Sequence, residues 1–109
     1  MSQSDCFQGD DNLKEQVIEQ KFRQAVAAAD GWALKLSCPG AAGIPDRMIL
    51  FPDARIGFVE VKAPGKKPRP LQIAQMNKLK KLGFPVFVLD DADQIQTIIE
   101  GVKYGIHPS

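Results

Sequence analysis

Two acidic residues and a lysine near the middle of the chain, Asp46, Glu60 and Lys62, have types and spacing that could bind a metal ion. Glu60 and Lys62 are two residues apart, so on a strand their side chains would share one face. If Asp46 lies across a hairpin from them, two carboxylates face each other, which is destabilising unless a cation lies between them. Mg²⁺ is typically held by one or two carboxylates and completes its shell with water and phosphate oxygens. A neighbouring lysine could stabilise charge on a phosphate or assist an attacking water.

The elements that would position these residues are two strands joined by a tight turn. Segments 46–51 and 57–62 indicate strands, and the residues between them have turn composition. A hairpin folded about Asp53 and Ala54 pairs positions whose numbers sum to about 107, give or take one. Asp46 would then lie opposite Glu60 or its neighbour, beside Lys62. The opposite face of the second strand is apolar and predicts core packing: Val59, Val61 and Ala63. A simpler alternative is an ordinary cross-strand ion pair between Asp46 and Lys62, with Glu60 in solvent.

The rest of the pattern predicts one α/β domain, a central mixed sheet flanked by helices in the order αβββαβα. Residues 1–10 show no periodicity and are expected to form a loose tail, which leaves 11–109 as the domain. Asn12 and Glu15 fit a capping box at the start of the first helix. The apolar face of that helix is formed at spacings of three and four by Ile18, Phe22, Ala25, Val26 and Ala29. This first helix is expected over 13–30. The other elements outside the hairpin are a strand over 32–37, a helix over 71–82 after Pro70, a strand over 85–89, and a last helix that Asp90 and Asp91 can cap.

Basic residues are concentrated in one part of the chain. The segment 62–81 contains seven of the fourteen basic residues and no acidic residue, and the rest of the chain carries seven basic against thirteen acidic residues. Such a block on an otherwise acidic domain indicates a polyanion-binding surface, although a solvated helix face with a charged loop would look the same.

Composition excludes two other classes. A 44% hydrophobic content argues against disorder, and no stretch reaches the roughly 18 apolar residues of a membrane span. No basic-then-apolar leader opens the chain, so we expect a cytoplasmic protein, with no membrane partner.

The chemistry-bearing residues resemble a known nuclease signature. The string Gly43-Ile44-Pro45-Asp46-Arg47, followed by Glu60-Val61-Lys62, resembles the PD-(D/E)XK pattern. Further segments in the same order resemble the VRR-NUC family of that superfamily: a helix glutamate, Lys35-Leu36, Pro68-Arg69-Pro70-Leu71-Gln72 and Leu82-Gly83-Phe84-Pro85-Val86. The resemblance covers about residues 15 to 98. It implies a restriction-endonuclease-like core and hydrolysis of DNA that depends on Mg²⁺ or Mn²⁺, often at branched or Holliday-junction-like structures, as in phage DNA processing or DNA repair.

The resemblance also implies roles for individual residues. Asp46 and Glu60 would hold the metal, the carbonyl of Val61 would add a ligand, and Lys62 would orient or activate the water. Gln72 would support the site or contact the scissile phosphate. Independently of the resemblance, Lys66, Lys67 and Arg69 lie directly after the second strand and are expected to bind phosphates, with a mobile surface loop as the simpler alternative. Lys35 resembles a family position and could face the substrate, although a lysine at a strand edge is common. Arg47 is expected to form a salt bridge.

The first helix offers two carboxylates for the same site. Counting back from Gly31, Glu19 matches the family position and flanks the apolar face, so it is favoured as a ligand of a second metal or of a metal-bound water. Glu15 lies closer to the middle of that face but has a capping role, and it remains the alternative.

A single small site cuts one strand, so cleavage of both strands of a duplex or junction predicts a twofold homodimer. Leu13 and Val17 project away from the apolar face of the first helix and could pack on a second subunit. The rival hypotheses are a non-catalytic DNA-binding module that uses the basic block 62–81, and a plain α/β interaction domain. Paired carboxylates argue against both, because a protein that only binds has no need of them.

Overall fold

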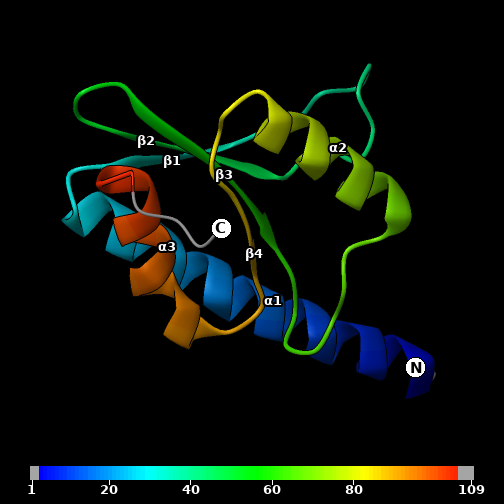
Figure 1. Ribbon diagram of the computed structural model, residues 1–109. Coiled ribbons are helices and arrows are strands. Elements are labelled where there is room, and N and C mark those ends of the chain that lie inside the picture. The colour runs from blue at the N-terminus through cyan, green and yellow to red at the C-terminus, as the bar shows by residue number, and fades with distance from the viewer. Residues whose placement is uncertain (1–2, 106–109) are drawn as a thin grey trace.

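A four-stranded sheet forms the middle layer of the computed structural model, which describes the backbone of residues 3–105 and the side chains of residues 11–105 (Figure 1). The strands lie in the order β1-β2-β3-β4. The first three are antiparallel, and β4 runs parallel to β3, so the mixed sheet predicted from the sequence is confirmed. Their bounds are β1 Trp32–Lys35, β2 Arg47–Phe51, β3 Arg55–Val61 and β4 Val86–Leu89.

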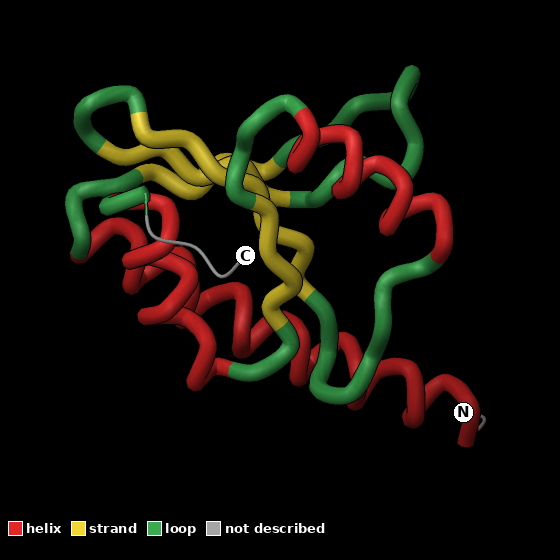
Figure 2. The backbone as a smooth tube through the Cα atoms, viewed as in Figure 1, coloured by secondary structure: helices red, strands yellow, loops and turns green. Residues whose placement is uncertain are grey.

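Three α-helices cover the sheet from its two faces (Figure 2). Helices α1 (Gln3–Ala28) and α3 (Ile95–Lys103) pack together on one face, and α2 (Pro70–Lys81) lies on the other. A short 3₁₀ turn, η1 (Ala92–Gln94), precedes α3, and Asp91 caps it by accepting a hydrogen bond from Asp93 N at 2.9 Å. The order αβββαβα is therefore confirmed, with η1 as an addition.

The apolar core lies between the sheet and the α1–α3 layer. Its buried side chains come from α1, from the matching faces of β2, β3 and β4, and from α3: Ile18, Phe22, Val26, Ile49, Phe51, Val59, Val61, Leu89, Ile95, Ile98, Ile99 and Val102. The α2 face is less apolar, since α2 buries only Gln72 and Met76. Phe58 and Phe84 add an edge-to-face contact there, with ring centroids 5.4 Å apart. Polar groups on the α2 face of the sheet are thus available for chemistry.

Helix α1 begins earlier than its sequence pattern predicts. It starts at Gln3, so residues 3–10, expected to be a loose tail, are helical, and Asn12 and Glu15 lie inside the helix and do not form its N-terminal capping box. Periodicity located only the part of the helix that packs on the core. Once that part has formed, each added residue gains a hydrogen bond, and no proline interrupts residues 3–12. The domain boundary at residue 11 stays a prediction.

The β2–β3 turn sets the register of the hairpin. Asp53 and Ala54 have φ angles of 67° and 60°, in the left-handed region that tight hairpin turns require. Arg47 pairs with Val59 and Phe51 with Arg55. Paired numbers therefore sum to 106, within the expected range, and continuing the ladder by one position places Asp46 opposite Glu60.

Candidate active site

Asp46 and Glu60 continue the hairpin beyond its last backbone pair through their side chains. Asp46 N donates a hydrogen bond to Glu60 Oε1 at 3.2 Å, and Val61 N donates to Asp46 Oδ1 at 3.1 Å. On the other side, Leu36 N donates to the Asp46 carbonyl at 2.8 Å, which ties this position to the end of β1. The two carboxylates are consequently fixed to the backbone at the point where regular pairing of β2 and β3 ends.

Glu60 is also held from the α2 side of the sheet. Its Oε2 accepts a hydrogen bond from Gln72 Nε2 at 3.0 Å and lies 3.4 Å from Lys62 Nζ. The Gln72 Oε1 accepts a hydrogen bond from Arg69 N at 2.8 Å, at the N-terminus of α2. Glu60 and Gln72 are only 5% and 6% exposed. The structure thus brings Asp46, Glu60 and Lys62 together, and it does not leave Glu60 in solvent as the simpler alternative would require.

The carboxyl groups at this place are electrostatically crowded. Burial is the main cause that raises the pKa of Asp46, and the nearby Glu19 raises it further. Burial also raises the pKa of Glu60, followed by repulsion from Asp46, which the Lys62 ammonium partly offsets. Glu15 has a raised pKa because of its burial first and the Asp46 charge second. Each of these shifts opposes ionisation, so a bound cation would relieve them.

The donor set suits a hard divalent cation. Among the described residues no group of three or more His, Cys, Asp or Glu side chains is arranged to hold a metal, so a site here would use two carboxylates and backbone oxygen. Val61 N points toward Asp46, whereas Lys62 N donates to Leu89 O on the opposite edge of β3. Because the N–H and C=O groups of one strand residue point to the same edge, the Val61 carbonyl also points toward Asp46. These oxygen donors fit Mg²⁺ or Mn²⁺.

The two candidate glutamates of α1 have different surroundings. Glu19 Oε1 lies 2.6 Å from Arg47 Nη2, and this confirms the expected salt bridge of Arg47. Arg47 is 5% exposed, and its Nε has no hydrogen-bond partner in the described part of the chain. Glu15, one turn earlier, lines a hollow of about 460 Å³ together with Lys62, Lys66 and Lys67. Residue counting did not distinguish these settings, because only the fold reveals that Arg47 engages Glu19.

The basic block 62–81 divides into two parts. Lys66, Lys67 and Arg69 are exposed on the loop between β3 and α2. This loop begins next to Asp46, Glu60 and Lys62, which together are called the acid–lysine group. Lys78, Lys80 and Lys81 lie in the last turn of α2, where positive charge complements the helix dipole. Lys35 is exposed and pairs in register with Arg47, so it lies on the α1 face of the sheet.

One ion pair at the hollow was not expected from the sequence. Lys66 Nζ lies 3.3 Å from Asp11 Oδ2, and both side chains are substantially exposed. The signal that could have found it is the spacing of Asp11 and Glu15, which places two acids on one face of a helix. Residue 11 precedes the helix predicted over 13–30, so the sequence pattern does not place Asp11 and Glu15 on one helix face.

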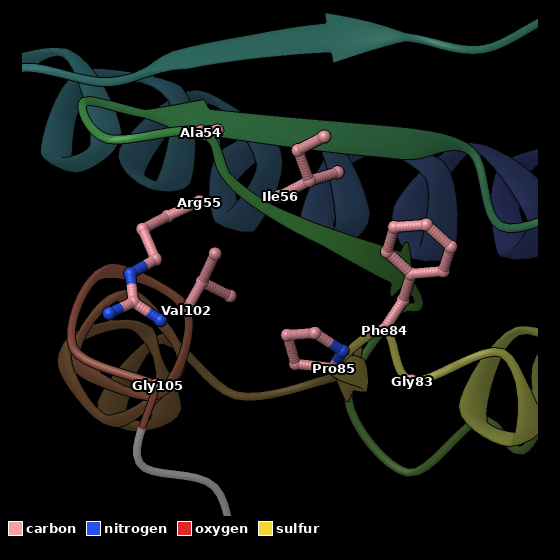
Figure 3. Close-up of a pocket in the computed structure, with 8 residues that line it drawn as sticks. All are labelled: Ala54, Arg55, Ile56, Gly83, Phe84, Pro85, Val102 and Gly105. Carbon is pink, nitrogen blue, oxygen red and sulfur yellow. The ribbon is translucent and has the colours of Figure 1, made fainter.

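A second hollow, of about 310 Å³, lies at the far end of β3 (Figure 3). Arg55, Ile56, Phe84 and Val102 are among its lining residues, and none of the acid–lysine group lines it. A Cβ on Gly105 would lie 3.0 Å from the Arg55 guanidinium, so Arg55 packs on the chain just after the C-terminus of α3. A cation at a helix C-terminus is a favourable structural arrangement in itself.

The mixed sheet, the flanking helices and the acid–lysine hairpin define an α/β domain of the PD-(D/E)XK class. A solved structure described as "VRR_NUC domain" matches with a TM-score of 0.74 and 33% identity, over 80% of this chain and 95% of that one. The chain is also 42% identical to "Putative nuclease p44" of Acyrthosiphon pisum secondary endosymbiont phage 1. The match extends over 91 residues, which are 84% of this chain and 97% of that protein. The chain belongs to the VRR-NUC domain family.

No family model matches the sequence. None of the helices within residues 3–105 combines the length and the apolar character that crossing a bilayer requires.

Proposed function

We propose that this chain is a nuclease that hydrolyses phosphodiester bonds of DNA with the help of a divalent metal ion. One observation above all supports the proposal: Asp46, Glu60 and Lys62 converge at the end of the β2–β3 hairpin, beside the exposed lysines of the 62–69 loop. The nuclease name of the phage relative agrees with it.

In this proposal Asp46, Glu60 and the Val61 carbonyl hold Mg²⁺ or Mn²⁺. Such an ion, when bound, polarises the phosphate and lowers the pKa of water. Lys62, now 3.4 Å from Glu60 Oε2, would donate to the attacking water or to a phosphate oxygen once the charge of Glu60 is neutralised. Gln72 acts as a positioning residue, since both ends of its amide are already bonded, one of them to Glu60.

For the α1 carboxylate that would bind a metal-bound water, in addition to the two carboxylates that hold the ion itself, we propose Glu15 in preference to Glu19. Glu15 lines the same hollow as Lys62, and Glu19 is not among the residues that line it. Glu19 is held by Arg47 at 2.6 Å, so binding a metal would require it to give up a largely buried ion pair. Glu19 then acts on the site through its own charge, which raises the pKa of Asp46, and through its partner Arg47, whose charge lowers that pKa.

The proposed substrate is duplex or branched DNA, including Holliday-junction-like structures, cut by a homodimer. Lys66, Lys67 and Arg69 would bind phosphates next to the scissile bond. Leu13 and Val17 are 61% and 51% exposed on α1, and this apolar strip is our candidate for the contact with a second copy. The phage origin of the relative suggests the cytoplasm of a bacterium or of a phage-infected host cell as the setting.

The test is a cleavage assay with labelled branched, duplex and single-stranded DNA in Mg²⁺, Mn²⁺ or EDTA. We expect cleavage only with metal, and its loss in Asp46→Ala and Lys62→Ala proteins. Glu100→Ala and Lys21→Ala, at exposed helix positions, are charge-matched controls that should cleave normally. A protein that binds every DNA but cuts none under all three conditions would be the non-catalytic DNA-binding module instead, and the nuclease proposal would fail.

A further inference from the structure

The loop that joins β1 to β2 is docked on the first two turns of α2. Gln75 Nε2 donates a hydrogen bond to the carbonyl of Ala42 at 2.9 Å. The next residue, Gly43, has φ +85°, and a Cβ there would lie 2.8 Å from Leu71 Cγ and 3.1 Å from the Leu71 carbonyl oxygen. The loop therefore approaches α2 at a distance that only glycine permits, and one side-chain hydrogen bond holds it there.

The anchoring of this loop is separate from the anchoring of the carboxylates. Asp46 is fixed through Leu36 N, Glu60 Oε1 and Val61 N, and none of these bonds involves residues 38–44. Gln72 holds Glu60 from the same helix, and its side-chain hydrogen bonds join it to Glu60 and to Arg69 N. Loss of the Gln75 bond would consequently release the loop while leaving the acid–lysine group in place.

The loop lies beside the N-terminal half of α2, whereas the basic segment first passes close to α1, where Lys66 pairs with Asp11, and then reaches the start of α2 (Figure 1). The segment 62–69 carries Lys66, Lys67 and Arg69, which suits the phosphates of the strand being cut. Residues 36–45, in contrast, include no charged side chain, and residues 39–43 are Pro, Gly, Ala, Ala and Gly. A neutral loop with small side chains allows the backbone of the second DNA strand to come close, and it does not bind the phosphates of that strand strongly.

We propose that Gln75 is a positioning residue that fixes the 38–44 loop as the wall contacting the second strand of duplex DNA. This inference rests on the proposed function, because it takes the acid–lysine group as the place of cutting. Gln75 acts through the loop carbonyl and is not itself in contact with the reacting atoms.

The test compares Gln75→Met, which keeps the length of the side chain but removes its donor, with Gln24→Met, the same change at an exposed position of α1. For Gln75→Met we expect the KM for duplex DNA to rise by about three- to tenfold, the range expected for one lost hydrogen bond. Its kcat and its KM for single-stranded DNA should stay within about twofold of the unmodified protein, because the carboxylates keep their bonds. Gly43→Ala should give the same pattern, and Gln24→Met should change nothing. Equal rises for both DNAs, or a fall in kcat alone, would overturn the inference.

A second readout does not depend on cleavage. Cys38 is exposed at the start of the loop, so a nitroxide label on it, in a Cys6→Ser background, reports the motion of the loop. The label should become more mobile in Gln75→Met and not in Gln24→Met. Dissociation constants for duplex and single-stranded DNA in EDTA complete the comparison. If the protein binds DNA without cutting it, the proposed function fails, but a duplex-specific loss of affinity in Gln75→Met still supports the role of the loop. A label that becomes more mobile in Gln75→Met while the affinity for duplex DNA stays unchanged would refute that role.

Discussion

Replacing Asp46 with asparagine should make the metal-free protein more stable while it abolishes cleavage. Asp46 lies opposite Glu60, and burial and the nearby Glu19 raise its pKa, so its charged form is disfavoured in the folded state. Asparagine has nearly the same size, and its Oδ1 can still accept the hydrogen bond from Val61 N. The substitution thus removes the charge and keeps the local geometry.

The size of the effect follows from two opposing contributions. If the two carboxylate charges are taken to be roughly 5 Å apart, the Cβ spacing of directly opposite residues in an antiparallel pair, they repel by about 3 kcal/mol at an effective dielectric constant of about 20. Exchanging a charge-assisted hydrogen bond for a neutral one costs about 1 kcal/mol. We expect the free energy of unfolding to rise by about 1 to 2 kcal/mol, which corresponds to a Tm increase of at least about 4 °C for a domain of this size.

The gain should depend on pH with a definite sign. The pKa of Asp46 in the folded protein lies above its ordinary value of 3.8, so the native state binds this proton more tightly than the unfolded chain does. The contribution of Asp46 to the stability of the unmodified protein is therefore fully present below that ordinary pKa and is lost as pH rises through the raised pKa. The advantage of Asp46→Asn should be full at about pH 7.5 and vanish below about pH 4.

Urea unfolding of the metal-free proteins at both pH values measures this difference. Added Mg²⁺ should stabilise the unmodified protein and leave the variant unchanged, because the variant lacks one of the proposed ligands. A variant that is less stable than the unmodified protein at pH 7.5, or one whose gain persists undiminished at acid pH, would refute the argument from crowded carboxylates.

The remaining predictions concern groups around the same site. Gln72→Met should lower the free energy of unfolding by about 2 to 3 kcal/mol, because a hydrogen bond to the charged Glu60 is lost. It should also move the acid limb of the activity profile to higher pH, because the Glu60 carboxylate loses a donor to its charged form. An unshifted pH profile would contradict this role. The double variant Lys66→Ala and Lys67→Ala should reduce the slope of log affinity for DNA against log salt concentration by about 2, and it should leave the affinity for Mg²⁺ unchanged. An unchanged slope in DNA titrations at several salt concentrations would show that these lysines do not contact phosphates. Glu15→Gln should weaken Mg²⁺ binding in calorimetry, whereas a weakening confined to Glu19→Gln would return the metal-binding role to Glu19.

Much of the fold could be predicted because local patterns carried it. Apolar segments bounded by turn residues located the strands, and glycine and proline marked the ends of α2 within a residue. The turn at Asp53 and Ala54 fixed a register, and a side-chain period of two then determined which residues share a face with Glu60. The N-terminal extension of α1 could not be predicted in this way, because periodicity detects only helix that packs on a core.

The partners of the long side chains could not be obtained from spacing. Whether Glu15 or Glu19 approaches Asp46 depends on how α1 crosses the sheet, and that crossing is set by the packing of Phe22 and Val26 against β2 and β3. The hydrogen bond from Gln75 to Ala42 joins residues 33 positions apart, and no pattern in the sequence around either residue predicts it.

The sequence by itself determined the order of the elements, the face of the hairpin that carries Asp46, Glu60 and Lys62, and the gathering of basic residues after β3. Those features depend on backbone periods and on turns, which act over a few residues. Only the tertiary structure decided which polar groups pair: Arg47 forms an ion pair with Glu19, Gln72 donates a hydrogen bond to Glu60, and Glu15 lines the hollow together with Lys62. Ion pairs and hydrogen bonds of this kind form only at a few ångströms, so they are settled by the packing of helix on sheet.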